Sequence, residues 1–484
     1  MEYVIQGRSP RKLYDFFEQI SAIPRGSRNE KEISEYLLAF AAERGLRVWR
    51  DDIYNVIIWK DGQNGGECQK PVLLECHTDI VCAKTPDSTH DFLHDPIRLI
   101  QEGNILHADR TTLGADNGCG VATILYILDS KDFPHPPLEC YFASQEEIGL
   151  IGASNIDVSK FKARRAIGLD AGTDGVLCEG ASSKYTYELC HAAQWEENHN
   201  QSWKLTVSGL MGGHSGAEID KNRANANSLL GKFLHGLDEK TDFELISVQG
   251  GQKDNAITRE ATAEILVLEE NVDAVREYAA SVQGAWREEY AGTDEGITVT
   301  VEDEGKQEVR VLHPTSKEKV IFFLVNVPYG VQKMSGTIKG LVETSTNIGI
   351  LKTSENEVMG SSSIRSSVET ARDSLSDKIA YLTEFLGGEY ERQGVYPAWE
   401  YRKDSPLRDK MVEVYEEMYG QKPNVVAIHA GLECGLFYKK MEGLDCVSLG
   451  PDMKDIHTSE EVLSISSTER VWKYLVKVLE ALKE

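Results

Sequence analysis

The first residues that could do chemistry are a histidine and a carboxylate two positions apart, within residues 74–79. Because alternate side chains of an extended strand share a face, we expect His77 and Asp79 on the same side. A carboxylate beside a metal-binding imidazole commonly holds the ring in one tautomer. Taken alone, such a pair is more often a hydrogen-bonded histidine in a turn at the end of a strand, and a metal site is the alternative.

Four further segments carry acidic or imidazole side chains close to apolar runs. Asp116 lies among glycines ahead of a predicted helix, where an Asp is otherwise a common N-cap. Glu146 and Glu147 follow an apolar run directly, and two adjacent carboxylates there are costly unless a cation balances them. Asp170 and His457 each follow a later apolar run. Each segment has a structural explanation when it is taken alone.

Together, these five segments supply two histidines and several carboxylates at strand ends of one domain. Ligands of open α/β sheets bind at the carboxyl ends of the strands. Such a set of side chains suits two divalent ions with one carboxylate bridging them. The sequence has no GxSxG nucleophile elbow, no P-loop and no cysteines at the spacing of a structural zinc site. The pattern favours a hydrolytic metal site with open coordination positions.

The elements that would position these residues alternate between helix and strand. Apolar residues recur at helical spacing in three segments, 10–20, 30–44 and 118–128. Short apolar runs lie between and after them, at 56–59, 71–76, 138–143 and 166–169. Strands separated by helices predict a mostly parallel central sheet with flanking helices, which is the α/β class.

The pattern of predicted secondary structure changes near residue 185. Alternating segments that indicate antiparallel strands occur at 204–208, 261–267, 297–301 and 320–327, mixed with helical stretches at 225–237 and 272–290. After residue 396 the helix–strand alternation returns. We therefore predict a catalytic domain formed by residues 1–184 and 395–484, interrupted by an inserted α+β domain of residues 185–394.

Charge and composition exclude several classes of partner. The 484 residues include 52 basic and 78 acidic ones, for a formal net charge of −26. An acidic chain is unsuited to nucleic acid or to anionic membranes. No run of 18 apolar residues and no secretory signal pattern is visible, and the nine cysteines include no CxxC pair. We expect a cytoplasmic protein without nucleic-acid or membrane partners.

Seven motifs occur in this order along the chain: ECHTDIV, RTTLGADNGCG, ASQEEIGLIGA, GLDAG, GLMGGHSG, HAGLECGLF and SLGPDMKDIHTSEE. With them, essentially the whole chain closely resembles the aminoacyl-histidine dipeptidases, also called Xaa-His or cytosol non-specific dipeptidases. That group is part of the co-catalytic zinc peptidases, which include carnosinase, carboxypeptidase G and aminoacylase. The resemblance implies a metallodipeptidase that hydrolyses unblocked dipeptides, with Xaa-His and β-alanyl-histidine as candidate substrates and the insert as a lid.

The resemblance also implies a metal centre with two Zn²⁺ per chain. His77 and Asp170 would bind one ion, Glu147 and His457 the other, and Asp116 would bridge the two. Mn²⁺ or Co²⁺ could substitute at such nitrogen and oxygen sites.

Two further carboxylates near the metals acquire roles from the same resemblance. Asp79 would orient His77, and Glu146 would be the general base that moves the proton of a bridging water to the leaving amine. The peptide between Asp116 and Asn117 would be cis.

In the lid, the resemblance implies residues that contact the substrate. His214 would stabilise the tetrahedral oxyanion, and Asn255 and Arg365 would hold the C-terminal carboxylate of the substrate. Gly431 and Glu433 would belong to a substrate-facing loop of the catalytic domain. The alternatives are a turn histidine beside glycines for His214 and a surface salt bridge for Arg365.

The expected partners are a dipeptide substrate and a second copy of the chain, in a homodimer through the lid domain. Whether the lid site is completed within one chain or across such a dimer is open from the sequence. Two other functions compete with the dipeptidase: an aminoacylase or deacetylase, and a peptide-binding scaffold that keeps the fold without catalysis.

Overall fold

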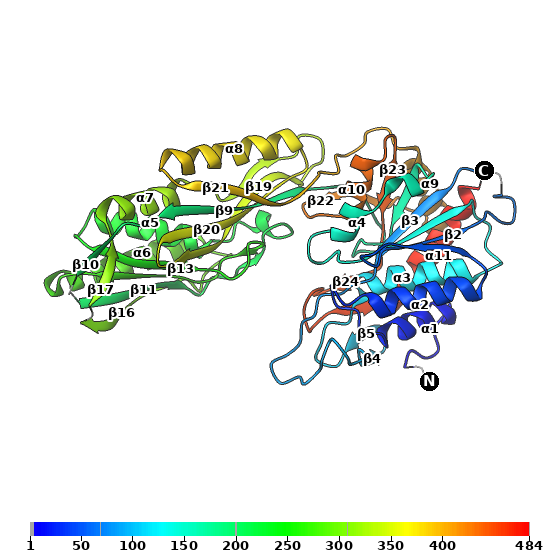
Figure 1. The fold of residues 1–484 in the computed structure, drawn as a ribbon, viewed down its shortest axis with the longest axis horizontal. Coiled ribbons are helices and arrows are strands. Elements are labelled where there is room, and N and C mark those ends of the chain that lie inside the picture. The colour runs from blue at the N-terminus through cyan, green and yellow to red at the C-terminus, as the bar shows by residue number, and fades with distance from the viewer. Residues whose placement is uncertain (1–3, 68, 199–200, 307, 484) are drawn as a thin grey trace. The chain divides into compact units, whose positions relative to one another are not determined.

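The computed structural model describes residues 4–67, 69–198, 201–306 and 308–483. Its contacts divide the chain into two compact units (Figure 1). The first unit comprises residues 1–181, 399–427 and 432–484, and the second comprises 182–398 and 428–431. The division into a catalytic domain and a lid domain with borders at 184/185 and 394/395 stays a prediction.

The first unit is built on an eight-stranded sheet whose four middle strands, in the order β6-β3-β7-β23, run parallel. Antiparallel strands flank them on each side. In sheet order the strands are β1 (Arg47–Arg50), β2 (Val56–Lys60), β6 (Leu138–Ala143), β3 (Val72–His77), β7 (Arg165–Gly168), β23 (Asp445–Ser448), β8 (Val176–Ala181) and β22 (Asn424–Ile428).

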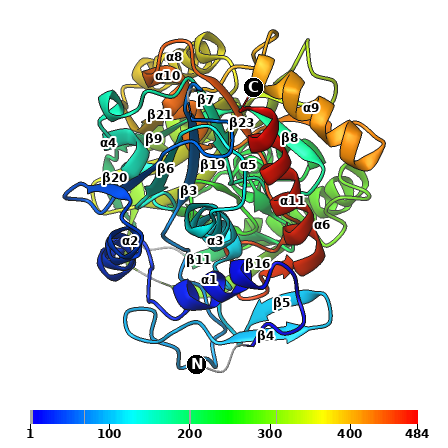
Figure 2. The ribbon, with the colours of Figure 1, turned by 90° about the vertical axis from the view of Figure 1, so that its right-hand side faces the viewer.

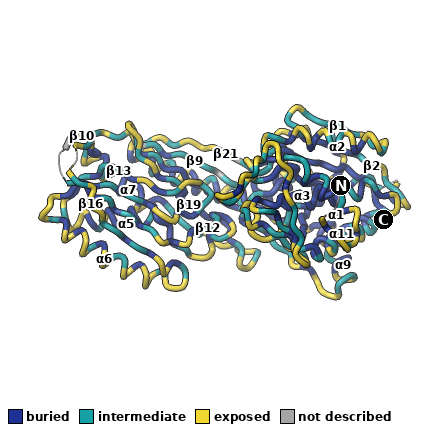
Figure 3. Tube along the Cα trace, turned by 90° about the horizontal axis from the view of Figure 1, so that it is seen from below, coloured by how far each residue is buried: buried dark blue, intermediate teal, exposed yellow. Residues whose placement is uncertain are grey.

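Helices cover both faces of this sheet because its central strands are apolar on both sides. The helices are α1 (Arg11–Ser21), α2 (Lys31–Glu43), α3 (Ala115–Asp129), α4 (Ile151–Asn155), α9 (Pro406–Tyr419), α10 (Glu433–Lys440) and α11 (Ile465–Ala481), with a 3₁₀ turn at Val158–Lys160. Val72, Leu74 and Cys76 of β3 belong to one large apolar cluster with residues of α1, α3 and α11. The ribbons of β3 and of these helices are labelled in Figure 2. The trace of α3 is buried almost throughout (Figure 3).

A small four-stranded sheet of the first unit joins segments that are distant in sequence. Its order is β24 (Met453–Lys454), β25 (Val462–Ser464), β5 (Ile105–Ala108) and β4 (Leu99–Glu102). Strands β24 and β25 pair antiparallel and so hold the loop 455–461 between them. Because β25 also pairs with β5, this loop is tied to the chain that leads into α3.

The second unit has a nine-stranded sheet in which every recorded pair is antiparallel. Its strands are β16 (Thr298–Lys306), β11 (Gln201–Ser208), β15 (Ala261–Leu266), β13 (Glu244–Gly250), β19 (Val342–Thr353), β20 (Glu357–Ser366), β9 (Ser183–Ala192) and β21 (Glu389–Tyr396), with β18 (Gly330–Met334) beside β19. Two short pairs are β10 (Trp195–Asn198) with β17 (Val309–Leu312), and β12 (Gly213–His214) with β14 (Ala256–Ile257).

The helices of the second unit are α5 (Ala226–Asp238), α6 (Val272–Glu289), α7 (Pro314–Asn326) and α8 (Glu369–Phe385), with 3₁₀ turns at Ile219–Lys221 and Glu269–Asn271. They pack on the sheet around a second apolar cluster. A mostly parallel sheet with helices, interrupted by an α+β insert, confirms the predicted fold class. Within the described ranges, no helix is both long and apolar enough to cross a bilayer.

One predicted element is wrong. The sequence predicts a strand at 320–327, but residues 320–326 form the second half of α7, and Val327 is its C-cap. Pro314 stands in the first turn and His313 accepts from the Thr315 N–H, which starts a helix. Val320, Phe323 and Leu324 are then buried on one helical face. An apolar run of this length is compatible with a buried helix as well as with a buried strand.

Candidate metal centre

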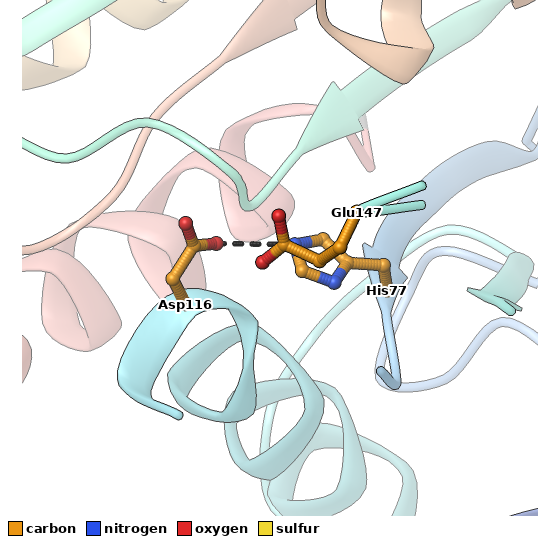
Figure 4. A group of neighbouring side chains, drawn as sticks. All are labelled: His77, Asp116 and Glu147. Carbon is orange, nitrogen blue, oxygen red and sulfur yellow. Dashed lines mark hydrogen bonds and ion pairs between the residues drawn. The ribbon is translucent and has the colours of Figure 1, made fainter. Parts of the chain in front are cut away.

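The centre begins at His77, the last residue of β3, whose side chain is 1% exposed. Its Nε2 lies 3.0 Å from Asp116 Oδ1, in the first turn of α3, and 3.5 Å from Asp170 Oδ1, two residues beyond β7. Figure 4 shows the side chains of His77, Asp116 and Glu147 converging. The carboxyl ends of neighbouring parallel strands thus bring these groups to one edge of the sheet.

A second histidine reaches the same carboxylate from the loop between β24 and β25. The Nε2 of His457 lies 3.2 Å from Asp116 Oδ2 and 3.0 Å from Glu147 Oε2. Asp116 therefore directs one oxygen to each histidine, and the Nε2 atom of each histidine is near one further carboxylate. The structure brings together the five residues that the sequence indicated as ligands. The peptide between Asp116 and Asn117 is cis, as predicted.

The donor set suits divalent ions. One ligand atom from each of His77, Asp116 and Glu147 lies within 4.8 Å of the others. Oε1 of Glu147 is buried and has no hydrogen-bond partner within the described part of the chain. A buried carboxylate oxygen without a donor is costly unless a cation occupies the space beside it. Imidazole nitrogens with carboxylate oxygens are ligands that Zn²⁺, Mn²⁺ and Co²⁺ accept.

The charges of these side chains also indicate a site for cations. Burial opposes the imidazolium form of His457, yet the contacts with Asp116 and Glu147 raise its pKa to about 11. Burial raises the pKa of the Glu147 carboxyl to about 7, even though His457 lowers it. Carboxylates outnumber imidazoles here, and this excess of negative charge is what bound cations would neutralise.

Asp79 connects the two halves of the centre. Its Oδ1 accepts from the backbone N–H of Glu146 at 2.9 Å, and its Oδ2 accepts from that of Glu147 at 3.2 Å and from Ser27 Oγ at 2.7 Å. Nδ1 of His77 is 3.1 Å from the Asp79 backbone carbonyl oxygen and 3.7 Å from Oδ1. The ring is therefore held by the Asp79 carbonyl, while the Asp79 carboxylate fixes the loop that carries both glutamates.

Glu146 follows in that loop. None of the described residues donates a hydrogen bond to its carboxylate. Burial raises the pKa of this carboxyl well above its usual range, and the nearby charges of Glu147 and Asp170 raise it further. A carboxylate with a raised pKa and free oxygens is suited to take and return a proton.

Three buried charged residues near the centre were missed as site residues. Glu75 shares the face of His77 on β3, which the two-residue repeat could have indicated, and burial raises its pKa to about 8. Arg25 donates to the carbonyl oxygens of Thr78 at 2.8 Å and Gly114 at 2.7 Å. Glu461 accepts four backbone N–H groups at the start of α3. No pattern in the sequence pairs these last two residues with their partners.

Glu433, a predicted substrate residue, is the first residue of α10 and is 1% exposed. Its Oε1 is buried and lacks a partner within the described ranges. Burial raises the pKa of its carboxyl well above the usual range, and Glu75 and Glu146 raise it further. A second orphaned carboxylate beside the general-base candidate could receive an ammonium group.

The second unit brings together His214, Asn255 and Arg365. The short strands β12 and β14 pair His214 with Ala256, and the Asn255 carbonyl accepts from the Ser215 N–H at 2.9 Å. Nδ1 of His214 accepts from the Ala217 N–H at 3.0 Å, so the neutral ring carries its proton on Nε2. His214 does stand in a turn beside glycines, but its ring is oriented as a hydrogen-bond donor.

Arg365 lies in β20 and is 4% exposed, so it does not form the surface salt bridge that was the alternative. Among the described residues, its Nε has no hydrogen-bond partner. A Cβ added at Gly216 would lie 3.2 Å from Arg365 Cζ and 3.0 Å from His214 Cε1, so the glycine lets both side chains approach. Gly431 belongs to the same unit and lies against Tyr396, whose hydroxyl oxygen would be 2.7 Å from an added Cβ.

Comparison with known proteins identifies the family. The chain is 35% identical to cytosol non-specific dipeptidase of Escherichia coli over 473 residues, covering 97% of each protein. The chain belongs to the cytosol non-specific dipeptidase family. Residues 205–294 also match the model of the peptidase dimerisation domain of M20 peptidases.

Solved structures agree with this family. Aminoacylhistidine dipeptidase of Vibrio alginolyticus is 34% identical, covers 98% of this chain and 97% of its own, and superposes with a TM-score of 0.84. Human carnosine dipeptidase 1, at 11% identity and a TM-score of 0.52 over 98% of this chain and 97% of its own, shares the fold. As a cytosol non-specific dipeptidase relative, the chain is a metallopeptidase-type hydrolase, which confirms the predicted family and enzyme class.

Proposed function

We propose that this member of the cytosol non-specific dipeptidase family hydrolyses unblocked dipeptides at a centre of two Zn²⁺ ions. The observation that carries the proposal is the position of Asp116, which directs one oxygen toward His77 and the other toward His457. His77 and Asp170 would hold one ion, Glu147 and His457 the other, with Asp116 shared. When bound, such ions polarise the scissile carbonyl and lower the pKa of the attacking water.

The proton transfers in the proposed reaction fall to Glu146. Its carboxylate would accept the proton of the attacking water and deliver it to the nitrogen of the leaving amine. The raised pKa suits the first of these transfers, because a carboxylate of ordinary glutamate strength is a weaker base and takes a proton from water less readily. Asp79 would keep Glu146 in place through the Glu146 backbone N–H.

Both ends of a dipeptide are charged, and the chain offers a group for each. We propose that Arg365 and Asn255, with Gly431 nearby in the same unit, hold the substrate carboxylate, since the buried Arg365 Nε lacks a partner among the described residues. Glu433 would accept the free α-ammonium. His214 would donate its Nε2–H to the oxyanion of the tetrahedral intermediate.

The requirement for a free ammonium separates the dipeptidase from the rival aminoacylase. An N-acetyl amino acid would place a neutral, bulky group against Glu433 and would form no ion pair with it, so the favourable contact of a free ammonium would be lost. A scaffold without catalysis is disfavoured because the general base and all five candidate ligands are present and near one another.

We base three further proposals, on the preferred substrate, the oligomeric state and the cellular location of this protein, on its similarity to known proteins. Xaa-His dipeptides and β-alanyl-histidine are the candidate substrates, since a similar structure is named aminoacylhistidine dipeptidase. The match to a peptidase dimerisation domain supports a homodimer through the insert, on which Tyr381 and Phe385 of α8 are 72% and 76% exposed one turn apart. We propose a cytoplasmic location, as for the E. coli relative.

The test is a substrate panel with metal analysis. Purified protein should contain two zinc ions per chain and hydrolyse free dipeptides, should lose that hydrolysis with a chelator, and should regain it with added zinc. N-acetyl amino acids should be hydrolysed far more slowly. Faster cleavage of N-acetyl amino acids, or dipeptide hydrolysis that survives removal of all metal, would overturn the proposal.

A further inference from the structure

Glu461 receives an unusual number of backbone hydrogen bonds at the edge of the candidate metal centre. Its Oε2 accepts from the N–H groups of Leu113 at 2.8 Å and Gly114 at 2.9 Å. Its Oε1 accepts from those of Ala115 at 2.9 Å and Asp116 at 3.2 Å. The side chain is buried, with 2% of the residue exposed, and its partners lie 345–348 residues away in sequence.

Three of these N–H groups, those of Gly114, Ala115 and Asp116, lie at the N-cap and in the first turn of helix α3, and the Leu113 N–H directly precedes them. The helix begins at Ala115, and its N-cap is Gly114, which has no side chain to offer. First-turn N–H groups have no acceptor within a helix, and a negative charge at this end is favourable. Glu461 thus caps α3 from a distant part of the chain.

The backbone of Gly114 is hydrogen-bonded through both its N–H and its carbonyl group. Glu461 accepts the Gly114 N–H, and Arg25, which is 2% exposed, donates to the Gly114 carbonyl at 2.7 Å. The same guanidinium donates to the Thr78 carbonyl, one residue after His77. The buried charges of Glu461 and Arg25 have opposite sign and both contact the segment 113–116, so each reduces the cost of burying the other.

The loop that carries Glu461 also carries His457. One segment between β24 and β25 therefore reaches Asp116 twice, through His457 Nε2 at Asp116 Oδ2 and through Glu461 at the Asp116 N–H. We propose that Glu461 is a positioning residue that fixes the shared carboxylate of Asp116 between the two histidines and so sets the affinity of the metal pair. This inference rests on the proposed metal-dependent function.

Glu461→Gln tests this role with little change of shape. An amide has only one acceptor oxygen, so two of the four N–H groups would face an NH₂ group instead of an oxygen. We expect Asp116 to shift, with metal affinity about 10- to 100-fold weaker, which is the usual effect of losing a group that orients a ligand. Glu461→Asp keeps both oxygens on a shorter side chain and should give an intermediate loss.

Two control variants separate positioning from general damage. Glu460→Gln changes the neighbouring exposed carboxylate, which has no bond to the start of α3. Asp445→Asn removes a buried carboxylate that caps α9, accepting from Ser405 Oγ at 2.6 Å and from the Leu407 N–H at 2.8 Å. Both should bind metal as the wild type does, although Asp445→Asn should also lower the thermal midpoint.

The measurement is calorimetric titration of the metal-free full chain with Zn²⁺, together with the thermal midpoint of each metal-free variant. Weaker zinc binding in Glu461→Gln than in Asp445→Asn, at equal or smaller loss of thermal midpoint, supports the positioning role. Equal zinc affinity in Glu461→Gln and Glu460→Gln overturns it. A wild type that binds no zinc pair would instead overturn the proposed function, so the two failures are distinguishable.

Discussion

His429 is buried in the second unit with both ring nitrogens occupied by hydroxyls, which predicts a specific pH dependence of stability. Nδ1 lies 2.8 Å from Ser182 Oγ and Nε2 lies 2.6 Å from Ser345 Oγ. Burial, with help from the positive charge of Arg365, lowers the pKa of His429 to about 3. The folded protein therefore holds a neutral imidazole that the unfolded chain would protonate.

The magnitude follows from proton linkage. An unfolded histidine has a pKa of about 6.5, so the unfolded state binds a proton below that pH. The folded state binds the same proton only below about pH 3. Stability is therefore lost as pH falls through this window. Relative to neutral pH, the loss should be about 1.3 kcal/mol at about pH 5.5 and about 2.5 kcal/mol at about pH 4.5.

The assay is hydrogen exchange of the β19 and β20 amides across this pH range, in the wild type and in His429→Gln. The substituted glutamine does not titrate, so the difference in opening free energy between the two proteins should shrink by these amounts as pH falls. His94→Gln, a change at a 77% exposed side chain, is the control and should leave the wild-type pH dependence intact. Parallel pH profiles for the wild type and His429→Gln would refute the reasoning.

Three further predictions concern the substrate and the metals. Arg365→Ala should lower kcat/KM for dipeptides by about 30-fold or more, because losing one partner of a buried charge pair costs about 2 kcal/mol or more. The variant should also hydrolyse a dipeptide and its C-terminal amide equally well. Steady-state kinetics on both substrates measures the two effects. Gly216→Ala should lower dipeptidase activity while metal content stays at the wild-type level, because an added Cβ would lie 2.5 Å from the His429 carbonyl oxygen. A fully active variant would contradict this close packing. His457→Ala should lose metal and activity together in parallel elemental and kinetic analysis, and full metal content would argue against His457 as a ligand.

Much of the metal centre could be predicted because parallel strands end at one edge of a sheet. His77 ends β3 and Asp170 follows the adjacent parallel strand β7, so the order of apolar runs and polar strand ends predicts that they lie close together. Glu75 was predictable by the same alternation that paired His77 with Asp79 but was not singled out.

Other features depended on contacts that the sequence does not encode locally. Arg25 and Glu461 are the clearest cases, because nothing in their own segments reveals that they meet the start of α3 from opposite directions along the chain. Residues 320–327 show a different limit, since a short apolar run satisfies the burial needs of a strand and of a helix. His429 was seen only as part of a motif, and its two serine partners come from β19 and from the residue just before β9.

The most direct test of the central claim is the Glu146→Ala variant, examined for metal content and for dipeptide hydrolysis. No candidate metal-ligand contact depends on the Glu146 carboxylate, so the variant should keep two zinc ions per chain. Its kcat should fall by about 10²- to 10⁴-fold, the usual contribution of a general base. Wild-type kcat in a variant with full metal content would contradict the account.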